Sequence, residues 1–156
     1  MKKLLISLLV LLVSGIVAKA EQEPGTERMW KDLDLVEMRL VAYGDWKKGK
    51  ELNRSTPEFG ETEYFKYHGN KSKNDREGTL FWRTLDKNEN TYKAKLRKNI
   101  MQLDGKVDVD ASGNNDRSYR NSLKMEWFEI DEARNVTVFI TDSFGMYRIF
   151  KGTLRR

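Results

Sequence analysis

The chain has 156 residues, enough for one domain with its own hydrophobic core. It carries 29 Lys and Arg against 24 Asp and Glu, and it contains no cysteine. The absence of cysteine excludes disulfides, thiol chemistry and Cys-based zinc sites.

Residues 1–20 have the pattern of a secretory signal peptide. Lys2 and Lys3 precede an apolar block from Leu4 to Val17, and Ala18 and Ala20 form the small-x-small pattern of a cleavage site. The block has 14 positions, fewer than the roughly 20 that a membrane-spanning helix needs. We therefore expect a secreted or periplasmic protein with no membrane span after cleavage; an uncleaved anchor is the alternative.

Much of the apparent basicity belongs to this segment. Lys2, Lys3 and Lys19 lie in it without any acid, and removing these three from 29 basic residues leaves 26 against 24 acidic ones. A near-neutral mature chain gives little reason to expect a nucleic-acid partner. The sequence leaves the oligomeric state open.

The rest of the chain divides into a polar, flexible start over residues 21–29 and one domain over residues 30–156. The first stretch of the domain, residues 30–43, is ambiguous. Its apolar residues recur at both helical and strand spacing: Met29, Leu33, Val36 and Leu40 for a helix, and Val36, Met38, Leu40 and Ala42 for a strand. We expect a short turn near Trp30, followed by a strand that ends at Gly44.

Strand patterns follow at short intervals, with polar loops at residues 45–60 and 69–78. The predicted strands cover residues 61–68, 79–85, 91–96, 99–103, 106–110, 123–130, 136–141 and 146–154. Asp104-Gly105 predicts a tight hairpin turn, and residues 111–119 predict a loop. About eight short strands joined by turns predict an all-β fold, either a sandwich or a single antiparallel up-and-down barrel, after a cleaved signal peptide.

The last three predicted strands form a meander. Leu123, Met125 and Trp127 alternate with polar residues, so we expect all three side chains to face the core. Phe144 lies in the tight turn beside Gly145, where its ring should stay outside the core.

Three segments carry a family resemblance: LVEMRLVAYGDWKKGKEL (Leu35–Leu52), PEFGETEYFKYHGN (Pro57–Asn70) and FEIDEARNVTVFITDSFGMYRIFKG (Phe128–Gly152). The order, spacing and residue types of these segments resemble those of small bacterial exported lipocalin-like proteins, which are calycin-type β-barrels. The resemblance implies a barrel of about eight strands that binds a small apolar or amphipathic molecule.

Catalytic signatures are missing from the sequence. His68 is the only histidine, and one imidazole cannot build a histidine metal site. The sequence contains no nucleophile elbow, HExxH motif, phosphate-binding loop or dinucleotide fingerprint. We therefore expect a protein that is not an enzyme and needs no cofactor.

One segment resembles an incomplete calcium loop. Asp108, Asp110, Ser112 and Asp116 supply oxygen atoms at positions one, three, five and nine, with Gly113 at the sharp turn. Tyr119 replaces the bidentate glutamate of position twelve, so any Ca²⁺ affinity should be weak. The alternative is an Asp- and Gly-rich turn between strands.

Aromatic residues are the candidates for lining a ligand site. We select six of them: Tyr64, Phe65, Phe81, Trp82, Tyr92 and Trp127. The same rings could instead fill the barrel, because eight strands enclose room for either outcome. In that case the protein would be a non-enzymatic interaction protein that contacts another exported protein or a surface glycan through its polar loops.

Overall fold

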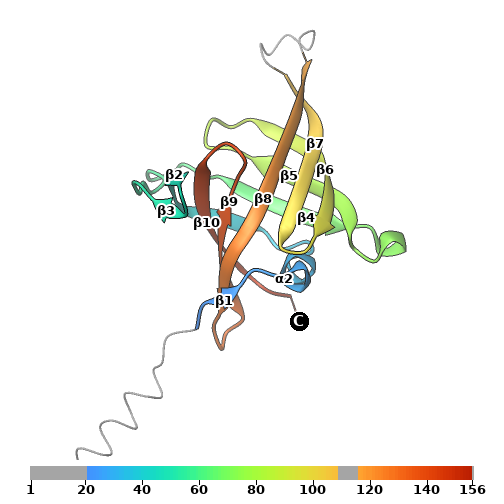
Figure 1. Ribbon diagram of the computed structural model, residues 1–156, viewed down its shortest axis with the longest axis horizontal. Helices are drawn as coiled ribbons and strands as arrows, with labels where there is room; N and C mark the ends of the chain where they lie inside the picture. Colours follow the sequence, from blue (N-terminus) through green and yellow to red (C-terminus); the bar gives the residue numbers. More distant parts are fainter. Residues whose placement is uncertain (1–20, 109–115, 156) are drawn as a thin grey trace, which may run out of the picture.

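The computed structural model describes residues 21–108 and 116–155, so the predicted signal peptide lies outside the described part. Eight strands form the barrel: β2 (Met38–Lys47), β4 (Tyr64–Gly69), β5 (Glu77–Arg83), β6 (Glu89–Arg97), β7 (Ile100–Asp108), β8 (Asp116–Ile130), β9 (Asn135–Thr141) and β10 (Met146–Thr153). They pair antiparallel in chain order, and β10 pairs back with β2 (Figure 1). This closure confirms the up-and-down barrel and excludes the sandwich.

Four short elements are attached to the barrel. Strand β1 (Glu23–Pro24) pairs with β8, and β3 (Lys50–Glu51) pairs with β2. Helix α2 (Glu27–Asp32) precedes β2, and the 3₁₀ turn η1 (Lys71–Lys73) follows β4. Among the residues that the structure describes, no helix has the length and apolar character needed to cross a bilayer.

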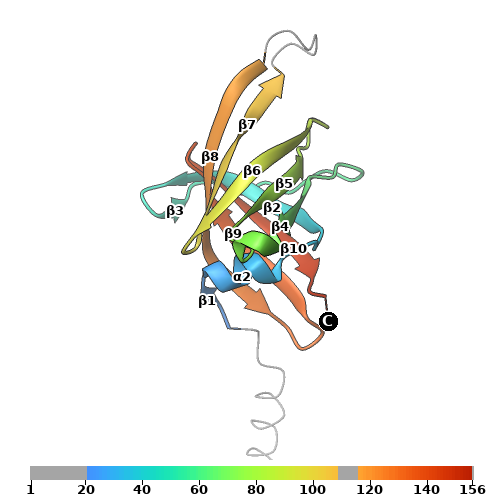
Figure 2. The same cartoon turned by 90° about the vertical axis from the view of Figure 1, so that its right-hand side faces the viewer.

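Helix α2 closes one end of the barrel, opposite the turn between β9 and β10 (Figures 1 and 2). The Thr26 hydroxyl caps the helix by accepting a hydrogen bond from the Met29 N–H at 2.9 Å. Trp30 is fully buried, and its indole N–H donates to the Asn99 carbonyl at 2.9 Å. The helical spacing and the strand spacing seen in the sequence therefore both occur, the first in α2 and the second in β2.

The end of strand β2 differs from the prediction. Strand β2 runs through Gly44 to Lys47, because Gly44 pairs with Tyr147 in β10. A side chain at position 44 would collide with the Asn53 carbonyl oxygen, whose distance from the added Cβ would be 2.3 Å. The glycine therefore permits close packing and does not end the strand.

The predicted hairpin at Asp104-Gly105 is wrong. Both residues lie inside the continuous strand β7, and the chain turns at Lys98, which takes a positive φ of 55°. Gly105 pairs with Tyr119, and a Cβ at Gly105 would lie 2.8 Å from the ring of Tyr92. Glycine is needed here for the close approach of a ring. The predicted loop over 111–119 is also too long, since β8 begins at Asp116.

Trp127 does not face the barrel interior as expected. The register of β8 shifts between Met125 and Trp127, so that Met125 and Phe128 both join the interior core. Trp127 lies outside, half-buried, with its ring stacked on Phe139 at 5.4 Å. The irregularity turns the tryptophan to the opposite face, which strict alternation could not anticipate. Phe144 is 63 % exposed, in agreement with the prediction.

A second, smaller apolar cluster covers the outside of the barrel around Phe139. It contains Ala42, Phe139, Tyr147 and Ile149, with Trp46 and Trp127 packed against it. The loop after β3 lies over this cluster, and the Tyr147 hydroxyl donates to the Asn53 carbonyl at 2.6 Å. Some of the chain's aromatic residues therefore stabilise the outer wall and not the interior.

Candidate functional site

The structure divides the six predicted aromatic residues equally between the two faces of the wall. Phe65, Trp82 and Tyr92 belong to the interior core. Tyr64 and Phe81 precede two of them in the chain and so face outward, where their ring centroids lie 5.8 Å apart. Trp127 lies outside as described above. The barrel thus brings only three of the six together.

The predicted calcium ligands cannot be followed as a group. Asp110 and Ser112 lie outside the described residues, and Asp108 and Asp116 are described only as paired positions at the ends of β7 and β8. His68 lies on β4, with its Nδ1 atom 3.5 Å from Asp34 Oδ1. Within residues 21–108 and 116–155, no three His, Asp or Glu residues are grouped so as to hold a metal ion.

The end of the barrel opposite α2, here called the far end, carries the most distinctive chemistry. Alternate hairpin turns of an up-and-down barrel lie at opposite ends, and α2 contacts the β6–β7 turn through Asn99. The β5–β6 turn and the β9–β10 turn, residues 142–145, are therefore at the far end (Figure 1). Half-buried side chains here, Tyr43, Leu85 and Tyr119, pack against the interior core.

Three charged side chains are buried near the far end. The Arg148 guanidinium lies 3.0 Å from Glu63 Oε1 and 2.9 Å from Asp142 Oδ2. The side chains of Arg148, Glu63 and Asp142 are 17 %, 5 % and 3 % exposed, so solvent screens these pairs little. Asp142 also accepts hydrogen bonds from the N–H groups of Phe144 and Met146, which orders the turn.

Trp82 completes this group, which we call the charged layer: Glu63, Trp82, Asp142 and Arg148. The indole N–H of Trp82 donates to Glu63 Oε1 at 2.9 Å, and Arg148 lies 5.0 Å from the ring centroid. Strands β2 and β4 separate β10 from β5 in the wall, so the Arg148 side chain crosses much of the interior to reach Trp82. The charged layer therefore reaches across the interior from β10 to β5.

Aromatic rings accompany the charged layer at the far end. Tyr92 and Tyr119 lie with their ring centroids 4.7 Å apart over Gly105, and Tyr119 lies 6.0 Å from Phe144. Asn121 holds Tyr119 by donating to its hydroxyl at 2.8 Å. The Ser143 hydroxyl in turn donates to Asn121 Oδ1 at 2.8 Å, which links β8 to the β9–β10 turn.

Burial changes the acidity of these tyrosines. It raises the pKa of Tyr92 to about 12, with a further contribution from Tyr119. Burial also raises the pKa of Tyr119, which the hydrogen bond from Asn121 partly opposes. At the α2 side of the core, burial and the nearby carboxylates of Asp75 and Asp34 raise the pKa of Tyr67 to about 12. All three hydroxyls are thus neutral hydrogen-bonding groups at physiological pH.

We expect the folded protein to lose stability at alkaline pH. A tyrosine ionises near pH 10 in the unfolded chain, whereas Tyr67 and Tyr92 ionise near pH 12 in the folded one. Between these values the unfolded chain releases protons that the folded chain retains. The contribution of Tyr67 and Tyr92 to the free energy of unfolding is therefore constant below about pH 10 and falls from there to about pH 12. Urea unfolding across this range, with tyrosinate absorbance, measures the effect. A flat stability profile through pH 12 would contradict the prediction.

No clear signal for the charged layer is present in the sequence. Glu63 and Glu61 have the spacing of one strand face, which is also the pattern of a solvated face. Arg148 alternates with Phe150 on one face of β10, while Tyr147 and Ile149 occupy the other. Because both faces carry apolar residues, the pattern does not show which one is interior.

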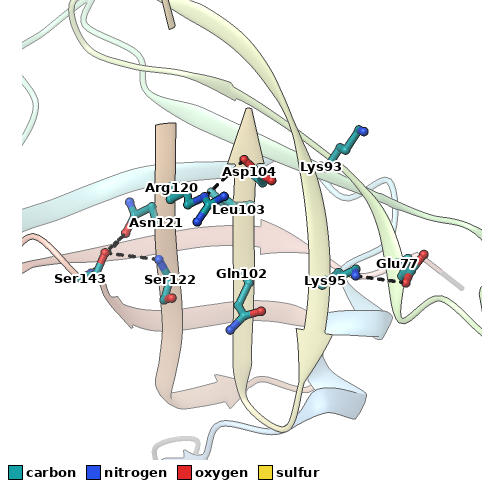
Figure 3. A pocket seen from close by; sticks show the side chains of 10 residues that line it. All are labelled: Glu77, Lys93, Lys95, Gln102, Leu103, Asp104, Arg120, Asn121, Ser122 and Ser143. Atoms are coloured by element: carbon teal, nitrogen blue, oxygen red, sulfur yellow. Dashed lines mark hydrogen bonds and ion pairs between the residues drawn. The ribbon is translucent and has the colours of Figure 1, made fainter. Parts of the chain in front are cut away.

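A large hollow lies on the outer face of the sheet. It has a volume of about 720 Å³ and is lined by outward-facing residues of β5 to β8, among them Lys93, Lys95, Gln102, Asp104 and Arg120 (Figure 3). Ser143 of the β9–β10 turn borders it. This outer groove is polar, whereas the far end combines aromatic rings with buried charge.

Among the described residues, the side chains near the far end do not form a catalytic relay. Ser143 hydrogen-bonds to the Asn121 amide, and His68 lies on a different part of the barrel beside Asp34. Aromatic rings beside a buried charged layer offer contacts to both the apolar and the polar part of an amphipathic molecule. The chain matches no protein-family model, and comparisons with curated proteins and with solved structures find no similar protein.

Proposed function

We propose that the protein is an exported, non-enzymatic binding protein with a lipocalin-like barrel, which takes a small amphipathic molecule at the far end. The observation that carries this proposal is the aromatic series Tyr92–Tyr119–Phe144 beside the charged layer. The series leads from the buried ring of Tyr92 to the exposed ring of Phe144. An apolar body can lie against these rings while a polar group reaches toward the buried charges.

The charges favour one kind of polar group. Glu63 and Asp142 carry two negative charges against the single positive charge of Arg148, so the layer has a net charge of −1. Such a layer favours a cationic or hydrogen-bond-donating ligand and disfavours a carboxylate. The aromatic faces add to this preference, because a ring attracts a cation placed over it.

The proposal can be tested with two surfactants of equal chain length, dodecylamine and dodecanoate, both used below their micelle concentrations. We expect dodecylamine to change the intrinsic tryptophan fluorescence, because Trp82 lies in the charged layer. Dodecanoate should bind at least about tenfold more weakly, the factor that about 1.4 kcal/mol of charge preference produces.

Two exposed phenylalanines provide a matched pair of variants. Phe144→Ala removes the outermost ring of the series and should weaken dodecylamine binding by about fivefold, as the loss of one aromatic contact does. Phe59→Ala removes a fully exposed ring from the loop between β3 and β4 and should leave binding unchanged. Equal weakening in both variants, or no fluorescence response to either surfactant, would exclude the far end as the site.

A second candidate function is supported by the packing of the interior. From Trp30 to the charged layer, core side chains such as Leu80, Met101 and Met125 are fully buried and belong to one continuous cluster. A barrel filled in this way favours contacts made through its outside. In this second function, the protein would bind a partner outside the cell through the polar outer groove.

A further inference from the structure

The outer groove contains two cross-strand rows of polar side chains (Figure 3). In one row Lys93 of β6 pairs in register with Asp104 of β7, which pairs with Arg120 of β8. The next row contains Glu77, Lys95, Gln102 and Ser122, again one residue from each successive strand. Cross-strand neighbours on one face lie about 5 Å apart, so the two rows form a continuous polar surface.

The cations of this surface are weakly engaged by protein acids. Lys95 Nζ lies 3.8 Å from Glu77, and Arg120 Nε lies 4.0 Å from Asp104, both at the limit of an ion pair. The side chains of Lys95 and Arg120 are 69 % and 84 % exposed. Lys93 forms no ion pair with any described residue. Three cations against two acids leave a positive groove whose charges can turn to a ligand.

A neighbouring hollow extends the groove. It has a volume of about 580 Å³, shares Glu77, Lys93 and Lys95 with the first hollow, and adds Asn70 and Lys71 from the region of η1. The two hollows therefore meet along the same side chains and form a track from η1 to the β9–β10 turn. A track of this form suits an extended chain better than a compact molecule.

We propose that the outer groove binds an extended acidic polysaccharide, one with a carboxylate on successive sugars. The carboxylates would pair with Lys93, Lys95 and Arg120. The sugar hydroxyls would donate to Glu77 and Asp104 and exchange hydrogen bonds with side chains such as Gln102. This site is separate from the far end, and the proposal names an occupant for the outer groove of the second candidate function.

Other polyanions fit the groove less well. His68 is the one ring among the described lining residues of the two hollows, so the groove offers no series of rings on which successive nucleic-acid bases could stack. Its most apolar lining side chain, Leu103, is buried, so nothing in the groove could insert into a lipid layer. Sugar hydroxyls can donate hydrogen bonds to Glu77 and Asp104, which a polyphosphate without hydroxyl groups cannot do.

Calorimetric titration with a galacturonate oligomer, at low and moderate salt, tests the proposal. We expect binding that weakens as salt rises, because the contacts are exposed charge pairs. The double variant Lys93→Gln/Lys95→Gln should bind at least about tenfold more weakly, since two charge-assisted contacts are lost. The matched control Lys47→Gln/Lys50→Gln removes two exposed lysines from the β2–β3 hairpin and should bind as the parent does.

Circular dichroism of each variant would establish that the barrel remains folded. The proposal is overturned by an absence of galacturonate binding, by equal losses in the two double variants, or by equal binding of a neutral glucan of the same length. Binding to anionic phosphatidylglycerol vesicles without any to the oligomer would also overturn it. Phe144→Ala should leave galacturonate binding unchanged, so the result is independent of the test made at the far end.

Discussion

Replacing Arg148 by methionine is expected to lower the free energy of unfolding by about 3–5 kcal/mol. The substitution keeps most of the side-chain volume but removes the charge that lies 3.0 Å from Glu63 and 2.9 Å from Asp142. Both carboxylates would then be buried without a cation. Stranded buried charges of this kind cost far more than a lost surface ion pair.

Urea unfolding of the Arg148→Met variant measures this loss, and Arg120→Met is a suitable control. Arg120 is 84 % exposed and lies 4.0 Å from Asp104, so its replacement should change stability by no more than about 0.5 kcal/mol. Glu63→Gln provides a second test of the same layer, since it retains the hydrogen-bonding shape of the side chain and removes one charge. A loss at Arg148 no larger than that at Arg120 would show that the charged layer does not stabilise the barrel.

Replacing Trp30 by alanine should have a similarly large effect, a loss of about 3–5 kcal/mol, as for other large-to-small changes in a core. Trp30 is fully buried where α2 closes the barrel, and its ring lies 6.2 Å from Phe65. The variant would leave a cavity and also leave the Asn99 carbonyl without its indole donor. Both the cavity and the unpaired carbonyl lower the free energy of unfolding.

Trp127→Ala is the matched control for this change. Trp127 is half-buried on the outside of the barrel, where its removal exposes part of Phe139 but leaves no enclosed cavity. We therefore expect a loss clearly smaller than that of Trp30→Ala in the same urea experiment. A larger loss at Trp127 would mean that the outer cluster, and not the α2 plug, is the more important part of the hydrophobic core.

The all-β class and the approximate strand positions could be predicted from the sequence because they depend on local chemistry. Alternation along β6, where Tyr92, Ala94 and Leu96 are buried between exposed lysines, requires only a strand with one face in the core. The helix that begins after Thr26 was expected only as a short turn near Trp30, although its cap and apolar spacing lie within a few residues. Such features need no knowledge of the rest of the chain.

The candidate site depended on contacts between distant residues. The irregularity in β8 turned Trp127 outward, and Gly105 became a place for the Tyr92 ring and not a turn. Neither feature can be predicted from the neighbouring sequence, because a register shift moves a side chain to the other face without changing the composition of the strand. The same holds for the rows of the outer groove, which exist only once β6, β7 and β8 are paired in register.

The sequence by itself therefore determined a β-rich domain, the spacing of its strands and the supply of aromatic residues for its core. Only the tertiary structure decided which rings face inward and which charges are buried. Arg148 and Glu63 are 85 residues apart in the chain, and their pairing arises when β10 and β4 take positions on either side of β2. A charge in an alternating strand is compatible with either face, and burial is favourable only where the closed barrel supplies its partner.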